Sequence, residues 1–322
     1  PFHGTPVKAN VYAPDWRDDA RVEYTLDLIQ ILAALVPDGV DGGVSTAPLS
    51  YKAWMTAEDD EGWRTVARNV ARVGEALARL RADTGTNIHL DIEPEPDCSI
   101  ENTSESIAFF ERWLLPDGAT ELSARLHVDE DDSRRLLLDH IRLCFDCCHF
   151  AVEYEDPAQA LRQLQASGLN IGRVQLSSAL KVAFPGDAAS VQRTSAALLP
   201  FADATYLHQV VQRGGACRGL CRYPDLDDAL RRADAQSAEW RIHFHVPLFA
   251  RDYESFASTQ DYVKQVIDLA VASPFTRHLE IETYTWDVLP AGLKVDLLES
   301  IAREYEWVLG AVRQTPAAAS PA

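Results

Sequence analysis

The sequence predicts an α/β protein whose parallel strands close into a (β/α)8 barrel. Apolar segments with helical spacing alternate with short apolar segments typical of buried strands along most of the 322 residues. Acidic, histidine and amide side chains follow strand after strand. A closed barrel gathers all its strand ends around one mouth, whereas an open doubly wound sheet gathers only those beside its switch point. The recurrence therefore favours a closed barrel.

Helical periodicity first occurs over residues 18–35, where Val22, Leu26 and Ile29 recur at intervals of three or four. Strands are predicted where short apolar runs follow turn residues or helix ends. The expected helices cover residues 18–35, 61–80, 101–113, 133–141, 157–166, 189–199, 262–272 and 293–312. The expected strands cover residues 39–44, 87–92, 143–146, 171–177, 240–246 and 278–283.

One segment does not follow this alternation. Residues 206–223 have extended character on either side of Gly214 and Gly215, which predicts a hairpin inserted between two βα units. The rest of residues 1–313 is expected to form a single domain, because one barrel requires a chain of this length. The tail over residues 314–322 is rich in Ala, Ser and Pro and is predicted to be disordered.

Charge and cysteine content restrict the classes of function. The chain carries 30 basic and 49 acidic residues, a net charge of −19. This balance disfavours nucleic acid or an anionic membrane as the partner, since such affinity rests on neutralising phosphate. The apolar runs are too short to cross a bilayer, and the six cysteines do not form the pattern of a small disulfide framework. We therefore expect a cytoplasmic protein with reduced thiols that acts on a small molecule.

The segment Cys144-Phe-Asp-Cys-Cys-His-Phe150 combines a carboxylate, Asp146, with an imidazole, His149, where a strand opens into a loop. This pair suits a divalent metal or a polar substrate, although alone it is a weak motif. No Gly-x-Gly-x-x-Gly motif or P-loop accompanies it. Its weight comes from other strands that end in the same residue types: Leu90-Asp-Ile-Glu-Pro-Glu-Pro96, Arg241-Ile-His-Phe-His-Val246 and His278-Leu-Glu-Ile-Glu-Thr283.

Five segments resemble the bacterial metabolite-traffic EboE family, and together they span nearly the whole chain. They are His3-Gly-Thr-Pro-Val-Lys-Ala-Asn-Val-Tyr-Ala-Pro-Asp-Trp16, Val44-Ser-Thr-Ala-Pro-Leu-Ser-Tyr-Lys-Ala-Trp54, Asp91-Ile-Glu-Pro-Glu-Pro-Asp-Cys98, Tyr206-Leu-His-Gln-Val-Val211 and Glu280-Ile-Glu-Thr-Tyr-Thr-Trp-Asp-Val-Leu-Pro290.

The resemblance implies a xylose-isomerase-like TIM barrel, related to sugar isomerases and epimerases and to endonuclease IV. It also implies a functional link to a pathway with a UbiA-type prenyltransferase, in the trafficking or export of a prenylated metabolite. Members of the family begin with a strand and a helix before the His-Gly-Thr-Pro segment. We therefore expect this chain to be truncated at its start and to lack the first βα unit, which would leave two barrel edges unpaired.

Carried over residue by residue, the resemblance implies a zinc or manganese site at the strand ends. Glu93 and Glu282 would be metal ligands that also serve as the catalytic carboxylates. The other implied metal ligands are Asp146, His149, His243, His245 and His3. Gln175, His208 and Lys8 are candidate substrate-binding residues, and Glu95 and Glu280 are candidates for the surrounding shell.

Two positions depart from the pattern of the superfamily. Ser45 or Thr46 stands where a histidine is expected after the third strand, and Gln175 stands where one is expected after the sixth. An amide oxygen is a weak ligand for a transition metal. The departures favour one or two metal ions over a three-zinc site.

Three functions remain open at this point. The first is a metal-dependent isomerase or epimerase that acts on a small polar or phosphorylated metabolite. The second is a metal-dependent phosphoester hydrolase, and the third is a carrier that holds a metabolite without turnover. A structural alternative also stands for the residues themselves. Glu93 and Glu282 could pair with arginines, and His243 and His245 could be a hydrogen-bonded pair on one face of a strand with no role as ligands.

Overall fold

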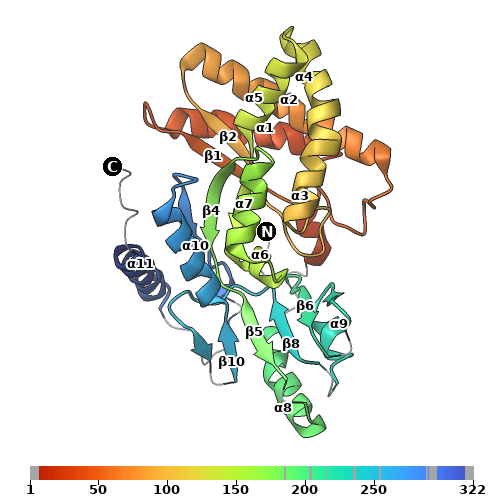
Figure 1. Cartoon of the computed structure of the whole chain (residues 1–322), viewed down its shortest axis with the longest axis vertical. Helices are drawn as coiled ribbons and strands as arrows, with labels where there is room; N and C mark the ends of the chain where they lie inside the picture. The colour runs from red at the N-terminus through yellow and green to blue at the C-terminus, as the bar shows by residue number, and fades with distance from the viewer. Residues whose placement is uncertain are drawn as a thin grey trace.

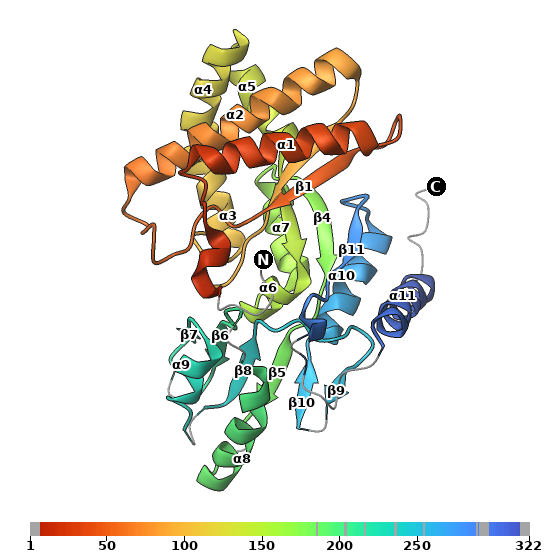
Figure 2. The same ribbon diagram turned by 180° about the vertical axis from the view of Figure 1, so that it is seen from behind.

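A computed structural model describes residues 7–184, 186–202, 205–215, 217–234, 237–253, 255–287, 289 and 296–315. Two sheets organise these residues (Figures 1 and 2). A parallel sheet with helices α1, α2, α4 and α5 forms one end of the molecule, and an antiparallel sheet with α8 and α9 forms the other. The protein is therefore mixed α/β, as the sequence predicts.

The parallel sheet is curled into half of a barrel (Figure 1). Arg173 on the fourth strand reaches the backbone oxygen of Gly43 on the first, across the two strands between them. His278, before the last strand of the order, lies 3.5 Å from Asp41, before the first. The strand order is β1 (Gly42–Thr46), β2 (Ile88–Ile92), β3 (Ile141–Asp146), β4 (Ile171–Leu176) and β11 (Leu279–Ile281).

The second sheet departs from the predicted barrel. The segment expected as a parallel strand over residues 240–246 ends at Ile242 and pairs antiparallel with two neighbours. The predicted hairpin over residues 206–223 is present, because β6 and β7 pair antiparallel, and it belongs to this sheet. The strand order is β7 (Leu220–Tyr223), β6 (Val210–Arg213), β8 (Glu239–Ile242), β5 (Leu180–Ala183), β10 (Phe256–Ser258) and β9 (Asp252–Tyr253).

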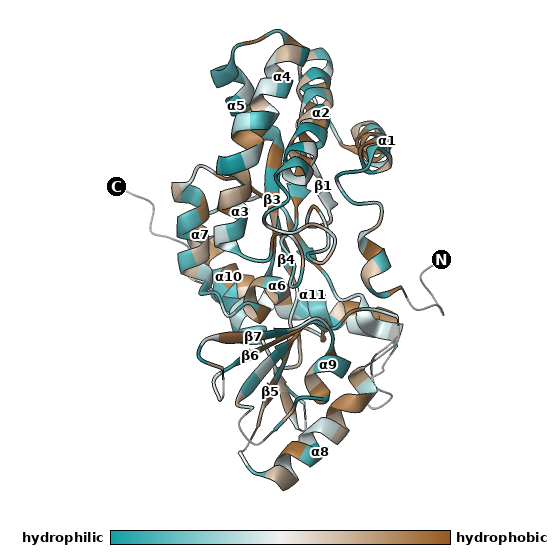
Figure 3. Ribbon diagram, turned by 90° about the vertical axis from the view of Figure 1, so that its right-hand side faces the viewer, coloured by the Kyte–Doolittle hydropathy of each residue, from teal (hydrophilic) through white to brown (hydrophobic). Residues whose placement is uncertain are grey.

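The helices match most predicted segments, with additions between them. Helix α2 begins at the cap Asp59, whose side chain accepts from the amide of Gly62, and ends at Gly85 with a φ of 76°. Both hydrophilic and hydrophobic residues lie along α2 and α5 (Figure 3). The α-helices are α1 (Asp19–Leu35), α2 (Asp60–Thr84), α3 (Thr103–Phe109), α4 (Ala119–Leu126), α5 (Glu130–His140), α6 (Cys147–Val152), α7 (Pro157–Ala166), α8 (Ala188–Leu198), α9 (Leu226–Leu230), α10 (Gln260–Ala272) and α11 (Leu297–Gln314). The other helical segments are η1 (Lys8–Tyr12), the π-helix η2 (Phe110–Gly118), η3 (Leu199–Phe201) and η4 (Thr285–Asp287).

Each sheet has its own apolar core. The larger core lies between the parallel sheet and helices such as α2, and it includes Leu90, Leu143 and Val174. The smaller core lies on the antiparallel sheet around Trp240 and Phe244. The ends of β2, β3 and β11 bring Glu93, Asp146 and Glu282 within 4.8 Å of one another.

Two further expectations can be compared with the structure. Cys217 and Cys221 form a disulfide across the end of the hairpin, so the expectation of six reduced thiols is wrong for this pair. Cys98, Cys144, Cys147 and Cys148 are free thiols. Among the described residues, no helix is both long enough and apolar enough to span a membrane.

Candidate metal centre

Asp146 joins strand β3 to helix α6 and serves both elements. Its Oδ1 caps the helix by accepting the backbone amide of His149 at 2.8 Å, and it also accepts the hydroxyl of Ser177 at 2.8 Å. Its Oδ2 is buried and has no hydrogen-bond partner among the described residues. The three-residue spacing from Asp146 to His149 is therefore a helix cap that leaves one carboxylate oxygen for another ligand.

Two glutamates extend this acidic group from neighbouring strands. Glu93 follows β2, where its Oε2 accepts the hydroxyl of Ser45 at 2.9 Å. Glu282 follows β11, and its carboxyl group interacts with that of Asp146. One oxygen from each of Glu93, Asp146 and Glu282 lies within 4.8 Å of the other two. Three carboxylates this close repel one another unless a proton or a cation lies between them.

The acidic group alters the pKa values of its members. Burial, together with the charges of Asp146 and Glu95, raises the pKa of Glu93 to about 7 against the opposing effect of His149. Burial, followed by the charges of Glu93 and Asp146, raises the pKa of Glu282 well above its ordinary value. Burial also acts to raise the pKa of Asp146, but the nearby His149 and His245 outweigh it and the net shift is downward. In the absence of a cation, one of the three carboxyl groups is protonated near neutral pH.

Three histidines around the carboxylates share one hydrogen-bond arrangement. The Nδ1 of His149 donates to the carbonyl oxygen of Pro94 at 2.9 Å. The Nδ1 of His245 donates to the carbonyl oxygen of Glu282 at 2.9 Å. The Nδ1 of His243 donates to Oε1 of Gln209 at 2.7 Å. Because these oxygens only accept, each ring carries a proton on Nδ1 and can present a lone pair on Nε2.

The Nε2 atoms point into the same region. Those of His149 and His243 lie 3.1 Å apart, and that of His245 is buried without a hydrogen-bond partner among the described residues. Burial lowers the pKa of His245 to about 4, and burial together with His149 lowers the pKa of His243 well below its ordinary value. Both rings are therefore neutral at neutral pH, which is the form that binds metals.

His149 differs from its two neighbours. Burial acts to lower its pKa, but the charges of Asp146, Glu93 and Glu95 outweigh burial and raise the pKa above the ordinary value. A proton on its Nε2 can therefore bridge to His243 when no cation is bound. Either a proton or a cation is needed at this point, since two facing lone pairs repel.

These residues fit a divalent transition metal. Buried carboxylate oxygens and imidazole nitrogens without partners are the ligands that Zn²⁺ and Mn²⁺ bind. The oxygens that accept from Nδ1 fix the orientation of the rings, as the outer hydrogen-bond partners of metal-binding histidines do. Asp146, His149 and His245 form one group with ligand atoms within 4.8 Å of one another, and Glu95, His149 and His243 form another.

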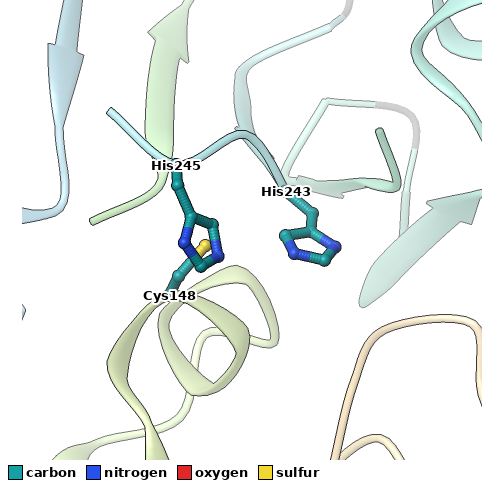
Figure 4. Close-up of side chains that lie close together, drawn as sticks. All are labelled: Cys148, His243 and His245. Atoms are coloured by element: carbon teal, nitrogen blue, oxygen red, sulfur yellow. The ribbon is translucent and has the colours of Figure 1, made fainter. Parts of the chain in front are cut away.

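Cys148 offers a different ligand set beside these groups. Figure 4 shows its sulfur, carried by α6, close to the rings of His245 and His243. The three side chains have ligand atoms within 4.8 Å of one another. Burial, followed by the charges of Asp146 and Glu282, raises the pKa of the Cys148 thiol well above its ordinary value. A metal ion that bound the sulfur would displace the thiol proton, so Cys148 with His243 and His245 is an alternative to the carboxylate and imidazole groups.

A cavity of about 260 Å³ lies against this cluster. Glu93, Glu95, His149, His243 and Glu282 line one part of it. Aromatic and apolar side chains line the remainder: Val11, Tyr12, Ala47, Tyr206, Leu207 and Tyr284. The cavity has room for a small metabolite that reaches both carboxylate and imidazole groups.

Several residues of the cavity carry no prediction from the sequence. Tyr12 donates to Oε1 of Glu95 at 2.6 Å and accepts from Gln209 at 3.1 Å, which connects the cavity wall to the residue that orients His243. Tyr284 packs against His245 with ring centroids 4.6 Å apart. No spacing or motif in the sequence relates Tyr12, Gln209 and Tyr284 to the site residues that they contact.

Other predicted site residues lie elsewhere. Lys8 donates to Asp225 at 2.6 Å and to the carbonyl oxygen of Tyr206 at 2.8 Å, and it does not line the cavity. His208 is buried behind the cluster, with its Nδ1 at 3.1 Å from the carbonyl oxygen of His243. His3 lies outside the described residues.

The remaining expectations concern the polar strand face. Oε1 of Gln175 accepts the thiol of Cys144 at 3.0 Å, beside Asp146 but outside the cavity lining. Glu280 pairs with Arg173 at 2.7 Å, deeper in the sheet than Glu282.

A scan of protein-family models and a search of curated proteins give no match to this chain.

Proposed function

We propose that the protein is a divalent-metal-dependent isomerase or epimerase that acts on a small polar metabolite. The single observation behind this proposal is the shared arrangement of His149, His243 and His245. Each ring is held by an Nδ1 donor bond, and the Nε2 atoms of His149 and His243 face each other at 3.1 Å beside a cavity that carboxylates also line. Holding the three rings in one orientation costs conformational entropy, and the binding of an ion offsets this cost.

The metal ligands in this proposal are Glu93, Asp146 and Glu282, with His149 and His245 beside them. A bound zinc or manganese ion would polarise a carbonyl oxygen of the metabolite and stabilise negative charge there. His243 lines the cavity and is oriented by Gln209, so it contacts the metabolite or completes the ligand set.

Glu93 is the proposed base. It lines the cavity, and a carboxylate oxygen that the ion does not bind can take a proton from the metabolite. Ser45 holds one of its oxygens, which fixes the carboxylate relative to the cavity. Glu282 lies opposite in the same acidic group and returns the proton. Tyr12 and Glu95 form a second hydrogen-bonded pair in the wall that can bind a hydroxyl group of the metabolite.

A carrier function is the second candidate, and the wall of the cavity favours it. Tyr12, Tyr206 and Tyr284 supply an aromatic surface that can hold an apolar part of a ligand. This surface fits the prenylated metabolite that the EboE resemblance implies. The same proposal includes three further points. The half-barrel is part of a TIM barrel, the protein is cytoplasmic, and it is functionally linked to a pathway with a UbiA-type prenyltransferase.

Hydrogen exchange with solvent tests catalysis. The protein, loaded with Mn²⁺ or Zn²⁺, is incubated in D₂O with a panel of aldoses, ketoses and their phosphates. We expect deuterium at the carbon next to the carbonyl of at least one compound, because a glutamate base exchanges its proton with water. Glu93→Gln should lower the exchange rate at least 100-fold.

The carrier function gives the opposite result. A metabolite that copurifies with the protein, identified by mass spectrometry, should then show no exchange in D₂O. Glu93→Gln would change only its affinity. Exchange that persists in Glu93→Gln and in Glu282→Gln would show that neither glutamate is the base.

A further inference from the structure

A second histidine and carboxylate cluster lies at the other end of the parallel sheet. His89 lies within β2, whereas His278 and Asp41 directly precede β11 and β1. The rings of His89 and His278 have centroids 5.6 Å apart, and Nε2 of His278 lies 3.5 Å from Oδ1 of Asp41. One ligand atom from each of the three residues lies within 4.8 Å of the other two.

The hollow of the curled sheet is shaped around His89. A Cβ atom at Gly43 would lie 2.4 Å from Cε1 of His89, and a Cβ atom at Gly172 would lie 2.7 Å from its Nδ1. Side chains at either position would therefore displace the ring. The imidazole is fully buried, so its position is fixed by packing as well as by hydrogen bonds.

The tautomer of His89 is fixed by a carboxylate. Nδ1 lies 2.6 Å from Oδ1 of Asp91, and Oδ2 of Asp91 accepts from Arg173 at 3.1 Å. Because the carboxylate of Asp91 accepts from the guanidinium on one oxygen and from the ring on the other, Nδ1 of His89 carries the proton. The Nε2 of His89 then presents a lone pair, the arrangement of carboxylate, histidine and metal found in zinc proteins.

The lone pair on Nε2 of His89 is buried and has no hydrogen-bond partner among the described residues. The buried Nε2 of His278 meets Oδ1 of Asp41 at 3.5 Å. A buried polar atom without a partner costs free energy, and a bound cation removes that cost. Ring nitrogens from two histidines and a carboxylate oxygen are ligands typical of zinc.

We propose that Asp41, His89 and His278 bind a divalent transition metal ion, with zinc as the best match. Three protein ligands leave one position of a tetrahedral ion for water. A cavity of about 610 Å³, lined by Asp41 and Arg277 among others, adjoins the cluster and gives the ion a route from solvent. The ion joins the starts of β1 and β11, the two end strands of the sheet order, and so holds the half-barrel closed at this end.

Zinc stoichiometry separates this site from the candidate metal centre. We would load the full chain with Zn²⁺, remove free ion by gel filtration and count bound zinc by mass spectrometry. The background is the Asp146→Asn/His245→Gln variant, in which the candidate metal centre has lost two ligands. We expect about one bound zinc in this variant, and we expect Asp41→Asn or His278→Gln added to it to weaken binding at least 100-fold.

Asp41 and His278 are suitable positions because both lie at the edge of the hollow, where substitution leaves the buried His89 and Asp91 in place. Asp38→Asn, an exposed change in the same turn, is the matched control and should leave zinc binding unchanged. Zinc that survives both Asp41→Asn and His278→Gln would overturn the proposal. So would the absence of bound zinc in the Asp146→Asn/His245→Gln variant while the unaltered chain binds one ion, a result that would leave the proposed function intact. The converse result is an unaltered chain that binds one zinc, which is lost only in Asp41→Asn and His278→Gln. That result would support this site and contradict the candidate metal centre.

Discussion

The Nε2 atoms of His149 and His243 face each other at 3.1 Å although the Nδ1 atom of each ring already donates to an oxygen. His149 belongs to α6 and His243 follows β8, so the pair joins the parallel sheet to the antiparallel one. The raised pKa of His149 lets a proton lie between the two nitrogens, and a bound cation can take the place of that proton. The metal proposal depends on this contact.

The orientation of His243 predicts an effect of a residue that touches no metal. Gln209→Leu removes the oxygen that accepts from Nδ1, so we expect zinc affinity to fall about 10- to 100-fold. Competition with a fluorescent zinc chelator measures the affinity. Gln212→Leu is the matched control, because Gln212 is also buried but accepts from Trp240 instead. An equal loss in both variants would show that the effect comes from general destabilisation.

Asp146→Asn separates the metal role of Asp146 from its helix cap. Asparagine caps helices about as well as aspartate, so the fold should be retained. The amide removes a charged ligand, and we expect zinc affinity at the candidate metal centre to fall at least 100-fold. Circular dichroism checks the fold, and zinc titration of the His278→Gln background checks the affinity. Full affinity in Asp146→Asn would remove Asp146 from the ligand set.

Glu153 predicts a dependence of stability on pH away from the proposed metal ligands. Burial raises its pKa to about 7, although Arg222 opposes the shift. The folded-state pKa lies above the unfolded value, so the folded state binds the extra proton. Stability from this group is therefore full below about pH 4.5 and is lost as the pH rises through about 7.

We expect Glu153→Gln to flatten the decline in unfolding free energy between pH 5 and pH 8 by roughly 2 kcal/mol. Urea unfolding at the two pH values measures the difference. Glu111→Gln, an exposed change, should leave the decline as it is in the unaltered chain. A decline that is the same in Glu153→Gln would show that Glu153 does not titrate in this range.

Gly172 is required for space in the hollow of the parallel sheet. A Cβ atom there would lie 1.7 Å from Oδ1 of Asp91, so Gly172→Ala must displace the pair of Asp91 and His89. We expect a loss of about 2 kcal/mol or more in unfolding free energy by urea titration. Gly310→Ala on α11 meets no atom within 4 Å and should be neutral or stabilising, since alanine favours helices. Equal stability in the two variants would show that the hollow is not tightly packed.

The sequence indicates the parallel strands and the acidic group well, because both depend on local patterns. Strands that end at Ile92 and Asp146 place Glu93 and Asp146 on one edge, as parallel strands require. The expectation of a parallel strand over residues 240–246 is wrong, because an apolar run does not specify the partner of a strand. The four residues of β5 are too few to show a period in the sequence.

Long-range contacts explain the other omissions. His89 lies in one strand and Asp41 and His278 directly precede two others, with no sequence spacing that relates the three, so the sequence shows them as ordinary residues of the predicted strands. The disulfide of Cys217 and Cys221 depends on the hairpin that brings the two residues together. Gln209 was missed because its role is to orient a ligand and not to be one.

X-ray absorption at the zinc edge tests the central claim most directly. The sample is zinc-loaded His278→Gln protein, in which the second cluster cannot contribute. We predict a first shell of nitrogen and oxygen at about 2.0–2.1 Å with outer scattering from at least two imidazole rings. A sulfur shell near 2.3 Å would show that Cys148 binds the ion in place of the carboxylates, and protein that retains no zinc would contradict the candidate metal centre altogether.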